Sequence, residues 1–172
     1  MNFRSDFRNT PSKWVVIILS ALSFWLSASL VIDLLIMPTL YATGMMSQDG
    51  FATAGYTIFG IFNRVELVCA ALILTGLLAL QNQYAVVGKS WQNLIVLAAI
   101  LLDIVLGYTY FLTPHMSALG MKLNLFDTAN SIPNSMNQMH TGYWLLEIAK
   151  IVIVAILLKL VYRQQSAEAK MG

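Results

Sequence analysis

Six ionisable side chains lie inside long apolar stretches of this sequence. They are Asp33, Arg64, Glu66, Asp103, Glu147 and Lys150. A charge in the middle of a bilayer costs about 2.5 to 3.5 kcal/mol on insertion scales, so we expect all six to face the interior of a helix bundle or a water-filled cavity and to find partners there. Four acids stand against two bases, which leaves two carboxyl groups without a basic partner. Each of these must be protonated, hydrogen-bonded to polar side chains, or balanced by a bound cation.

Three kinds of chemistry fit this intramembrane polar cluster. The first is structural, with two inter-helix ion pairs and neutral acids that hold the helices in register. The second is a cation-binding or proton-binding site that uses the surplus carboxyl groups. The third is a polar surface for the helices of a partner protein.

Spacing indicates which of these residues share a helix face. Positions three or four residues apart lie on one face of a helix, which predicts an inward-facing stripe on the last apolar segment. Its members are His140, Trp144, Glu147 and Lys150. Arg64 and Glu66 are two residues apart, so their side chains point about 160° away from each other. Arg64 is therefore expected to find its partner on another helix.

Soft ligands gather near one end of the predicted bundle. Both histidines, His115 and His140, fall there, together with Met136 and Met139. Thioether and imidazole ligands suit copper, above all Cu(I), far better than calcium or magnesium. Methionine is also an adaptable filler of apolar surfaces, and the sequence has no repeated Met-x-x-Met array. Copper is the candidate metal. Haem held by His115 and His140 is the less favoured alternative, because the histidines sit at helix ends, and no pigment is expected.

Motifs of enzyme active sites are missing from the sequence. It has no phosphate-binding loop, no Gly-x-Ser-x-Gly and no His-Glu-x-x-His, and no nucleophile has a base at helical spacing. The one cysteine, Cys69, lies inside an apolar segment and is interpreted as a buried structural thiol. We therefore predict that the protein is not an enzyme.

The elements that would position these residues are membrane-spanning helices. The composition is 58% hydrophobic and only 10% charged, far from that of a soluble domain. Four apolar stretches reach the roughly 20 residues needed to cross a bilayer, and their limits are about 14–37, 57–80, 91–113 and 142–162. Pro38 and Pro114 follow the first and third stretches and are expected to end those helices. The fold predicted is all-α, a four-helix integral membrane bundle forming a single domain over residues 1–172.

Basic residues predict the orientation of the bundle. Most lie in the two tails, in the short loop between the second and third helices, or at the end of the fourth, which places both termini in the cytoplasm. The net charge of +2 offers no case for nucleic-acid binding. The lipid bilayer and other membrane protein subunits are the expected partners. Long loops on the opposite side would supply a docking surface, with Met116, Met121 and Trp144 as candidate contacts.

Three segments together resemble a known family. They are "FWLSASLVIDLLIMPTLY", "YFLTPHMSAL" and "MHTGYWLLEIAK". This combination resembles the four-helix membrane family called domain of unknown function 4149, which is similar to human transmembrane protein 205 and is grouped with CopD-like copper-resistance proteins. The matching positions are Pro38, Pro114, His140, Glu147 and Lys150. The sequence is most similar to cyanobacterial members of this family. That resemblance implies a thylakoid or plasma membrane location and an accessory or assembly role such as photosystem II assembly.

The sequence as a whole favours a non-enzymatic membrane accessory or assembly factor that associates with a larger complex. The alternative is a protein that binds or handles copper or another metal. The Met and His residues would be the first ligands, and the intramembrane carboxylates would bind the metal further inside the bundle. A third alternative is a small proton-coupled transporter, which would need a polar path through the half of the bundle nearest the termini. Almost no polar residue is available there.

Overall fold

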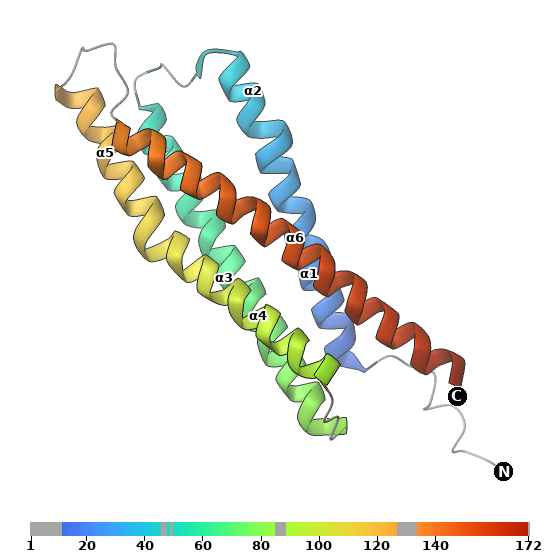
Figure 1. Ribbon diagram of the computed structural model, residues 1–172. Coiled ribbons are helices and arrows are strands. Elements are labelled where there is room, and N and C mark those ends of the chain that lie inside the picture. Colours follow the sequence, from blue (N-terminus) through green and yellow to red (C-terminus); the bar gives the residue numbers. More distant parts are fainter. Residues whose placement is uncertain (1–11, 46–47, 49, 85–88, 127–133, 172) are drawn as a thin grey trace.

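The computed structural model describes residues 12–45, 48, 50–84, 89–126 and 134–171. These residues are helical almost throughout and include no strand. The helical elements join into four rods, which run alternately up and down (Figure 1). The first rod is α1 (Lys13–Val31), a π-helical turn η2 (Ile32–Ile36) and α2 (Met37–Ala42), and the second is α3 (Phe51–Tyr84). The third is α4 (Lys89–Gly107), a π-helical turn η4 (Tyr108–Leu112) and α5 (Thr113–Phe126), and the fourth is α6 (Asn134–Met171).

Pro38 and Pro114 lie inside continuous helical rods, so the prediction that they end the helices is wrong. Proline removes one backbone donor, and its ring clashes with the carbonyl group four residues earlier. A π-helical turn precedes each proline by one residue, and its i→i+5 hydrogen bonds loosen the backbone where that clash would arise. Met37 separates η2 from Pro38, and Thr113 separates η4 from Pro114. The chain passes each proline without stopping.

All four rods are longer than the apolar stretches that revealed them. Apolar composition marks only the part of a helix that could lie in lipid, whereas good helix formers such as Gln, Ala, Glu and Lys extend α6 to Met171. Much of the long loop expected after Pro114 is α5 and the first turns of α6. The predicted docking loops are thus largely helical within the described part of the chain.

The rods form a closed ring of neighbours. α1 packs against α3 and α6, and α4 also packs against α3 and α6, so α3 and α6 lie diagonally opposite each other. The end of the bundle that carries α2, α5 and the start of α6 is here called the loop end, and the end that carries Lys13, Tyr84 and Lys89 is called the terminal end (Figure 1). The terminal half of the core is apolar. Its buried side chains include Ile18, Leu22, Ile73, Leu77, Leu94, Leu101, Leu157 and Val161.

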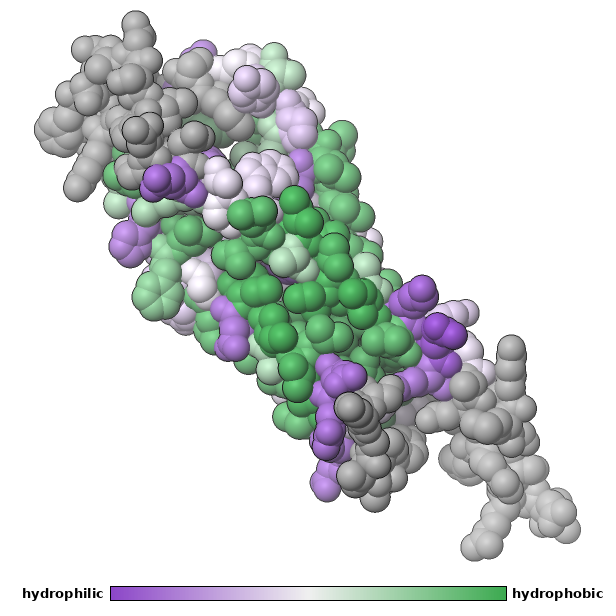
Figure 2. Space-filling model, in the orientation of Figure 1, coloured by the Kyte–Doolittle hydropathy of each residue, from purple (hydrophilic) through white to green (hydrophobic). Residues whose placement is uncertain are grey.

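The outside of the bundle is largely apolar as well. Figure 2 shows hydrophobic residues covering the middle of the visible face, with hydrophilic residues gathered toward the two ends. Three helices in the described residues are long and apolar enough to cross a membrane: Lys13–Ala42, Thr53–Asn82 and Trp91–Leu119. Large side chains such as Leu34 and Phe111, each 68% exposed, would contact lipid in such a position. These features are those of a membrane protein.

The two halves of the chain repeat one helical design. Pro38 and Pro114 are separated along the chain by the same number of residues as η2 and η4. The same separation relates buried Ile18 to buried Leu94 and buried Ser29 to buried Val105. Buried positions of α3 likewise recur in α6 at a constant separation along the chain, and Glu66 and Glu147 are equivalent positions in this repeat. The position of Asp33 in η2 corresponds to that of Thr109 in η4.

Candidate functional site

Four of the six predicted cluster residues meet in the core of the bundle. Asp33 is 5% exposed, and Glu66, Glu147 and Lys150 are each 1% exposed. Asp33 comes from η2, Glu66 from α3, and the other two from α6. The prediction that these residues line the bundle is confirmed by their burial, and we call them the carboxylate–lysine cluster.

Lys150 is the centre of this cluster. Its Nζ contacts Glu66 Oε1 and lies 2.6 Å from Glu147 Oε1. Because α3 and α6 are diagonal in the ring, the pair of Lys150 with Glu66 crosses the middle of the bundle. The ammonium group also lies over two aromatic rings, 5.7 Å from the centroid of Phe62 and 5.5 Å from that of Tyr108. Cation–π attraction of this kind stabilises the position of the ammonium group between these rings.

Glu66 also receives hydrogen bonds from the first rod. The indole Nε1 of Trp25 donates to Glu66 Oε1 over 2.8 Å, and the Ser29 hydroxyl donates to the same oxygen over 3.5 Å. Trp25 and Ser29 are four residues apart and Asp33 is four further on, so one face of the first rod carries all three. Sequence reasoning missed Trp25 and Ser29 as site residues, although this four-residue spacing was the signal that could have found them.

The remaining carboxyl groups lie toward the loop end. Asp33 and Glu147 are neighbours in this part of the cluster. The Tyr108 hydroxyl donates to the backbone carbonyl of Tyr143 over 3.3 Å and lies near Glu147. Within the described part of the chain, Glu66 Oε2, Asp33 Oδ2 and both carboxylate oxygens of Glu147 are buried and receive no hydrogen bond, although Glu147 Oε1 is ion-paired with Lys150.

Polar contacts continue from the cluster toward the loop end. Asn63 Nδ2 donates to Thr113 Oγ1 over 2.8 Å, and both side chains are buried. The ring of Tyr143 packs against Tyr108 with centroids 5.1 Å apart and meets Phe59 edge-on at 6.0 Å. Toward the terminal end the described core holds leucine, isoleucine, valine and alanine, together with Cys69, which is buried as expected. Among the described residues, polar groups therefore adjoin the cluster mainly on its loop side.

Two predicted members of the cluster lie elsewhere. Arg64 and Asp103 are exposed on the outside of α3 and α4, so the prediction that all six charges face inward is wrong. Arg64 is two residues from buried Glu66, and Asp103 is two residues from buried Leu101 and Val105. Two residues rotate a helix by about 200°, which turns each of these side chains away from the core. No ion pair joins either residue to the described part of the chain.

The stripe predicted on α6 is only partly inward. Glu147 and Lys150 are buried, whereas His140 is exposed and Trp144 is 46% exposed. Tyr143, four residues before Glu147, occupies the inward position that had been assigned to Trp144. At 3.6 residues per turn, a position four residues away lies about as close to the same face as one three residues away, and here packing against Tyr108 selects the former.

The candidate metal ligands are not brought together in the described residues. His115 is exposed, with its Nδ1 2.7 Å from the backbone oxygen of Phe111, and Met139 is half-buried. No group of three or more His, Cys, Asp or Glu in the described part of the chain is arranged to hold a metal ion. The side chain of Met136, and that of the docking candidate Met121, lie outside the described residues. Met116, another docking candidate, is half-buried.

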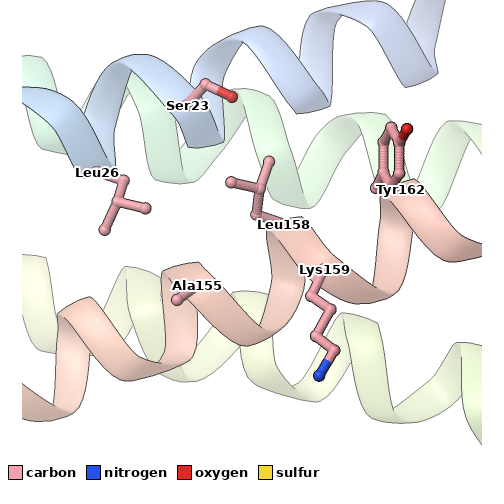
Figure 3. Close-up of a pocket in the computed structure, with 6 residues that line it drawn as sticks. All are labelled: Ser23, Leu26, Ala155, Leu158, Lys159 and Tyr162. Atoms are coloured by element: carbon pink, nitrogen blue, oxygen red, sulfur yellow. The ribbon is translucent and has the colours of Figure 1, made fainter.

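A shallow groove of about 430 Å³ lies between α1 and α6, away from the cluster. Its lining is Ser23, Leu26, Ala155, Leu158, Lys159 and Tyr162 (Figure 3). Leu26 and Leu158 lie between the two helices, whereas the ammonium end of Lys159 points away from α1. This groove is lined by no carboxyl group of the described residues and is not part of the site.

Comparisons with protein-family models, with curated proteins and with solved structures found no match to this chain.

Proposed function

We propose that this protein is a membrane-embedded four-helix bundle whose carboxylate–lysine cluster takes up and releases a proton, and whose helix packing responds to that proton. The observation that carries the proposal is the gathering of three carboxyl groups around one ammonium group, all four buried in the core. In this proposal α6 is a fourth membrane span, and both termini face the cytoplasm, as the basic residues predict.

The charge balance of the cluster supports a proton as its ligand. Asp33, Glu66 and Glu147 would carry three negative charges if all were ionised, against one positive charge on Lys150. The tyrosines Tyr108 and Tyr143 are titratable groups that also face the cluster, whereas Arg64 and Asp103 lie outside it. A buried charge without a partner is strongly unfavourable, so protons on the surplus carboxyl groups neutralise the site. Asp33 and Glu147 are neighbours and could share one such proton.

Access to the cluster is one-sided. Asn63, Thr113, Tyr108 and Tyr143 provide polar groups on the loop side, and the apolar core of the terminal half would resist entry from the other side. A proton would therefore exchange with the loop end. A bundle of this kind would sense or store a proton, and a transporter would require the terminal half to open.

The π-helical turn offers a way to couple the proton to the fold. Asp33 lies within η2, where the backbone already departs from regular α-helix, and Pro38 follows close behind. Kinks and bends concentrate at prolines and π-helical turns. Neutralising or charging Asp33 changes its attraction to Lys150 and its contact with Glu147, and we expect the first rod to shift at this point.

Infrared difference spectroscopy on protein reconstituted in vesicles tests this function. Acidifying the buffer should produce a C=O stretching band of a protonated carboxyl group, and Glu147→Gln should remove or shift it. Asp103→Asn is the control, since Asp103 is outside the cluster and its replacement should leave that band in place. A spectrum in which no cluster carboxyl changes between mildly acidic and mildly alkaline buffer would reduce the cluster to a structural ion pair.

Trp25 provides an independent reporter of the same site. Its indole N–H is bonded to Glu66, so protonation of Glu66 should alter the fluorescence of this residue. With Trp14, Trp91 and Trp144 replaced by Phe, the remaining emission should change with pH. The further replacement Glu66→Gln should abolish that change.

A second candidate function is the accessory or assembly role. Aromatic side chains exposed near the loop end favour it, because they can pack against helices of a partner as well as against lipid: Phe111 is 68% exposed, Tyr110 64% and Trp144 46%. Location in the thylakoid and a part in photosystem II assembly rest on the family resemblance alone. Native mass spectrometry of protein purified gently from its own membrane tests this role, because a mass equal to a multi-protein assembly would support it.

A further inference from the structure

Arg64 and Asp103 each lie in an otherwise apolar stripe on the outside of the bundle. On the face of Arg64, Ile61 is 57% exposed and Val68 is 59% exposed. On the face of Asp103, Ile100 is 41% exposed and Leu106 is 37% exposed. Each charge therefore lies on a surface that would otherwise suit lipid.

Neither charge can easily reach water. At 1.5 Å per residue, both lie within about 6 Å of the midpoints of the apolar helices Thr53–Asn82 and Trp91–Leu119. An arginine side chain can extend to the membrane surface from near a helix end, which is not where Arg64 lies. The aspartate side chain is too short to reach that surface from the middle of a helix. Ionisable residues in membrane spans normally face a protein or a wet cavity. A surface from outside this bundle is therefore needed to cover the two residues.

We propose that two copies of this chain associate side by side through α3 and α4, so that Arg64 of each copy pairs with Asp103 of the other. The two charges are opposite in sign, and the two helices that carry them pack against each other. A twofold interface brings the same surface of both copies together, so a surface with one cation and one anion is complementary to itself. This inference does not depend on the proton-binding function proposed above.

The depths of the two residues are compatible with this pairing. Counted from Tyr84 and Lys89, which both lie at the terminal end, Arg64 and Asp103 are offset by roughly 9 Å along the bundle axis. A twofold axis parallel to the helices keeps each residue at its own depth in both copies. The extended arginine side chain spans most of that offset, and its planar guanidinium group suits paired hydrogen bonds to a carboxylate.

Exchange of charges between copies tests the interface. Arg64→Asp alone places two acidic side chains together at each contact between the copies, and Asp103→Arg alone places two basic side chains together. Each variant by itself should self-associate at least about tenfold more weakly than the native protein, because like charges now face each other. When the two variants are mixed, one of the two contacts in a dimer of one copy of each has its charges reversed and the other keeps the native pair. Such a mixed dimer should therefore form.

The measurement is native mass spectrometry of differently tagged copies, with single-molecule photobleaching in vesicles as a check. Lys159→Leu is the matched control, since it removes an exposed charge from α6 and should leave the dimer intact. Helical content and monodispersity of each variant show whether it folds. Recovery of the mixed dimer also answers that concern, because misfolded chains would not recover.

Several outcomes would overturn the proposal. The native protein could be a monomer in vesicles, the single variants could dimerise as well as the native protein, or the mixed variants could fail to pair. A monomer that retains a bound phospholipid lost on Arg64→Leu would overturn it by assigning the surface to lipid. A complex with a different membrane protein, lost in both single variants, would overturn it by assigning the surface to that partner.

Discussion

The terminal half and the loop half of the bundle are built on the same helices but differ in what their cores contain. In the terminal half, apolar side chains of four helices fill the core, and Gly76 lets α1 and α3 approach closely. In the loop half, the same helices bury three acids, a lysine, and the pair formed by Asn63 and Thr113. The difference is one of chemistry within a shared geometry, since the buried positions keep their helical spacing through both halves. The terminal half therefore contributes apolar packing, whereas the loop half also carries the candidate site.

The largest effect is expected from removing the lysine at the centre of the cluster. Lys150→Met leaves the three buried carboxyl groups without the counter-charge that they surround, and loss of one partner of a buried pair typically costs about 3 to 5 kcal/mol. The loss should be greatest at alkaline pH and smaller at acidic pH, because protonation removes the uncompensated negative charge. Unfolding in detergent, followed by circular dichroism at several pH values, measures it.

Two further variants sharpen that result. Adding Glu66→Gln to Lys150→Met removes one of the stranded charges and should recover part of the stability. Lys159→Met on the same helix is the control, since Lys159 is exposed and its loss should change little. Equal effects of Lys150→Met and Lys159→Met would mean that the cluster contributes nothing to the fold.

The sequence could predict some features of the fold and of the site, and others depend on packing that it does not show. Apolar runs reveal the rods because a bilayer requires them, and the two-residue offset placed Arg64 opposite Glu66 correctly. The inward face predicted for Asp103 was wrong, because its neighbours from Leu101 to Leu106 are all apolar and show no helical period that would indicate its direction. The prediction that Pro38 and Pro114 end their helices was wrong because a π-helical turn depends on a backbone adjustment that the local sequence does not indicate. The bond from Trp25 to Glu66 joins helices far apart in sequence, and only packing brings them together.

A smaller effect, confined to the terminal half, is expected at Gly76. A Cβ atom there would lie 2.7 Å from Ile18 Cγ1 and 2.9 Å from Ile18 Cδ1, closer than carbon atoms can pack. Overpacking of this kind typically costs about 1 to 3 kcal/mol, so Gly76→Ala should destabilise the bundle by that amount. The change in the free energy of unfolding, measured by denaturation in detergent, should not vary with pH, since no titratable group is involved.

A double-mutant cycle identifies the contact responsible. Ile18→Ala removes the atoms that a methyl group at position 76 would meet, so its combination with Gly76→Ala should be less destabilised than the sum of the two single variants. Additive costs would place the strain elsewhere. A strong pH dependence of Gly76→Ala would show that the two halves are energetically coupled and cannot be treated separately.

The smallest effect is expected at the polar contact on the loop side of the cluster. Thr113→Val keeps the shape of the side chain but removes the oxygen that accepts the 2.8 Å hydrogen bond from Asn63. Hydrogen bonds between membrane helices average about 0.6 kcal/mol, although stranding the buried amide can raise the cost toward about 1 kcal/mol or more. Stability should therefore fall only slightly, whereas proton exchange at the cluster should slow because Asn63 and Thr113 lie on its proposed route. A time-resolved infrared measurement after a pH jump separates the two effects: slower rise of the carboxyl band with nearly native stability supports entry from the loop end, and an unchanged rate would place the route elsewhere.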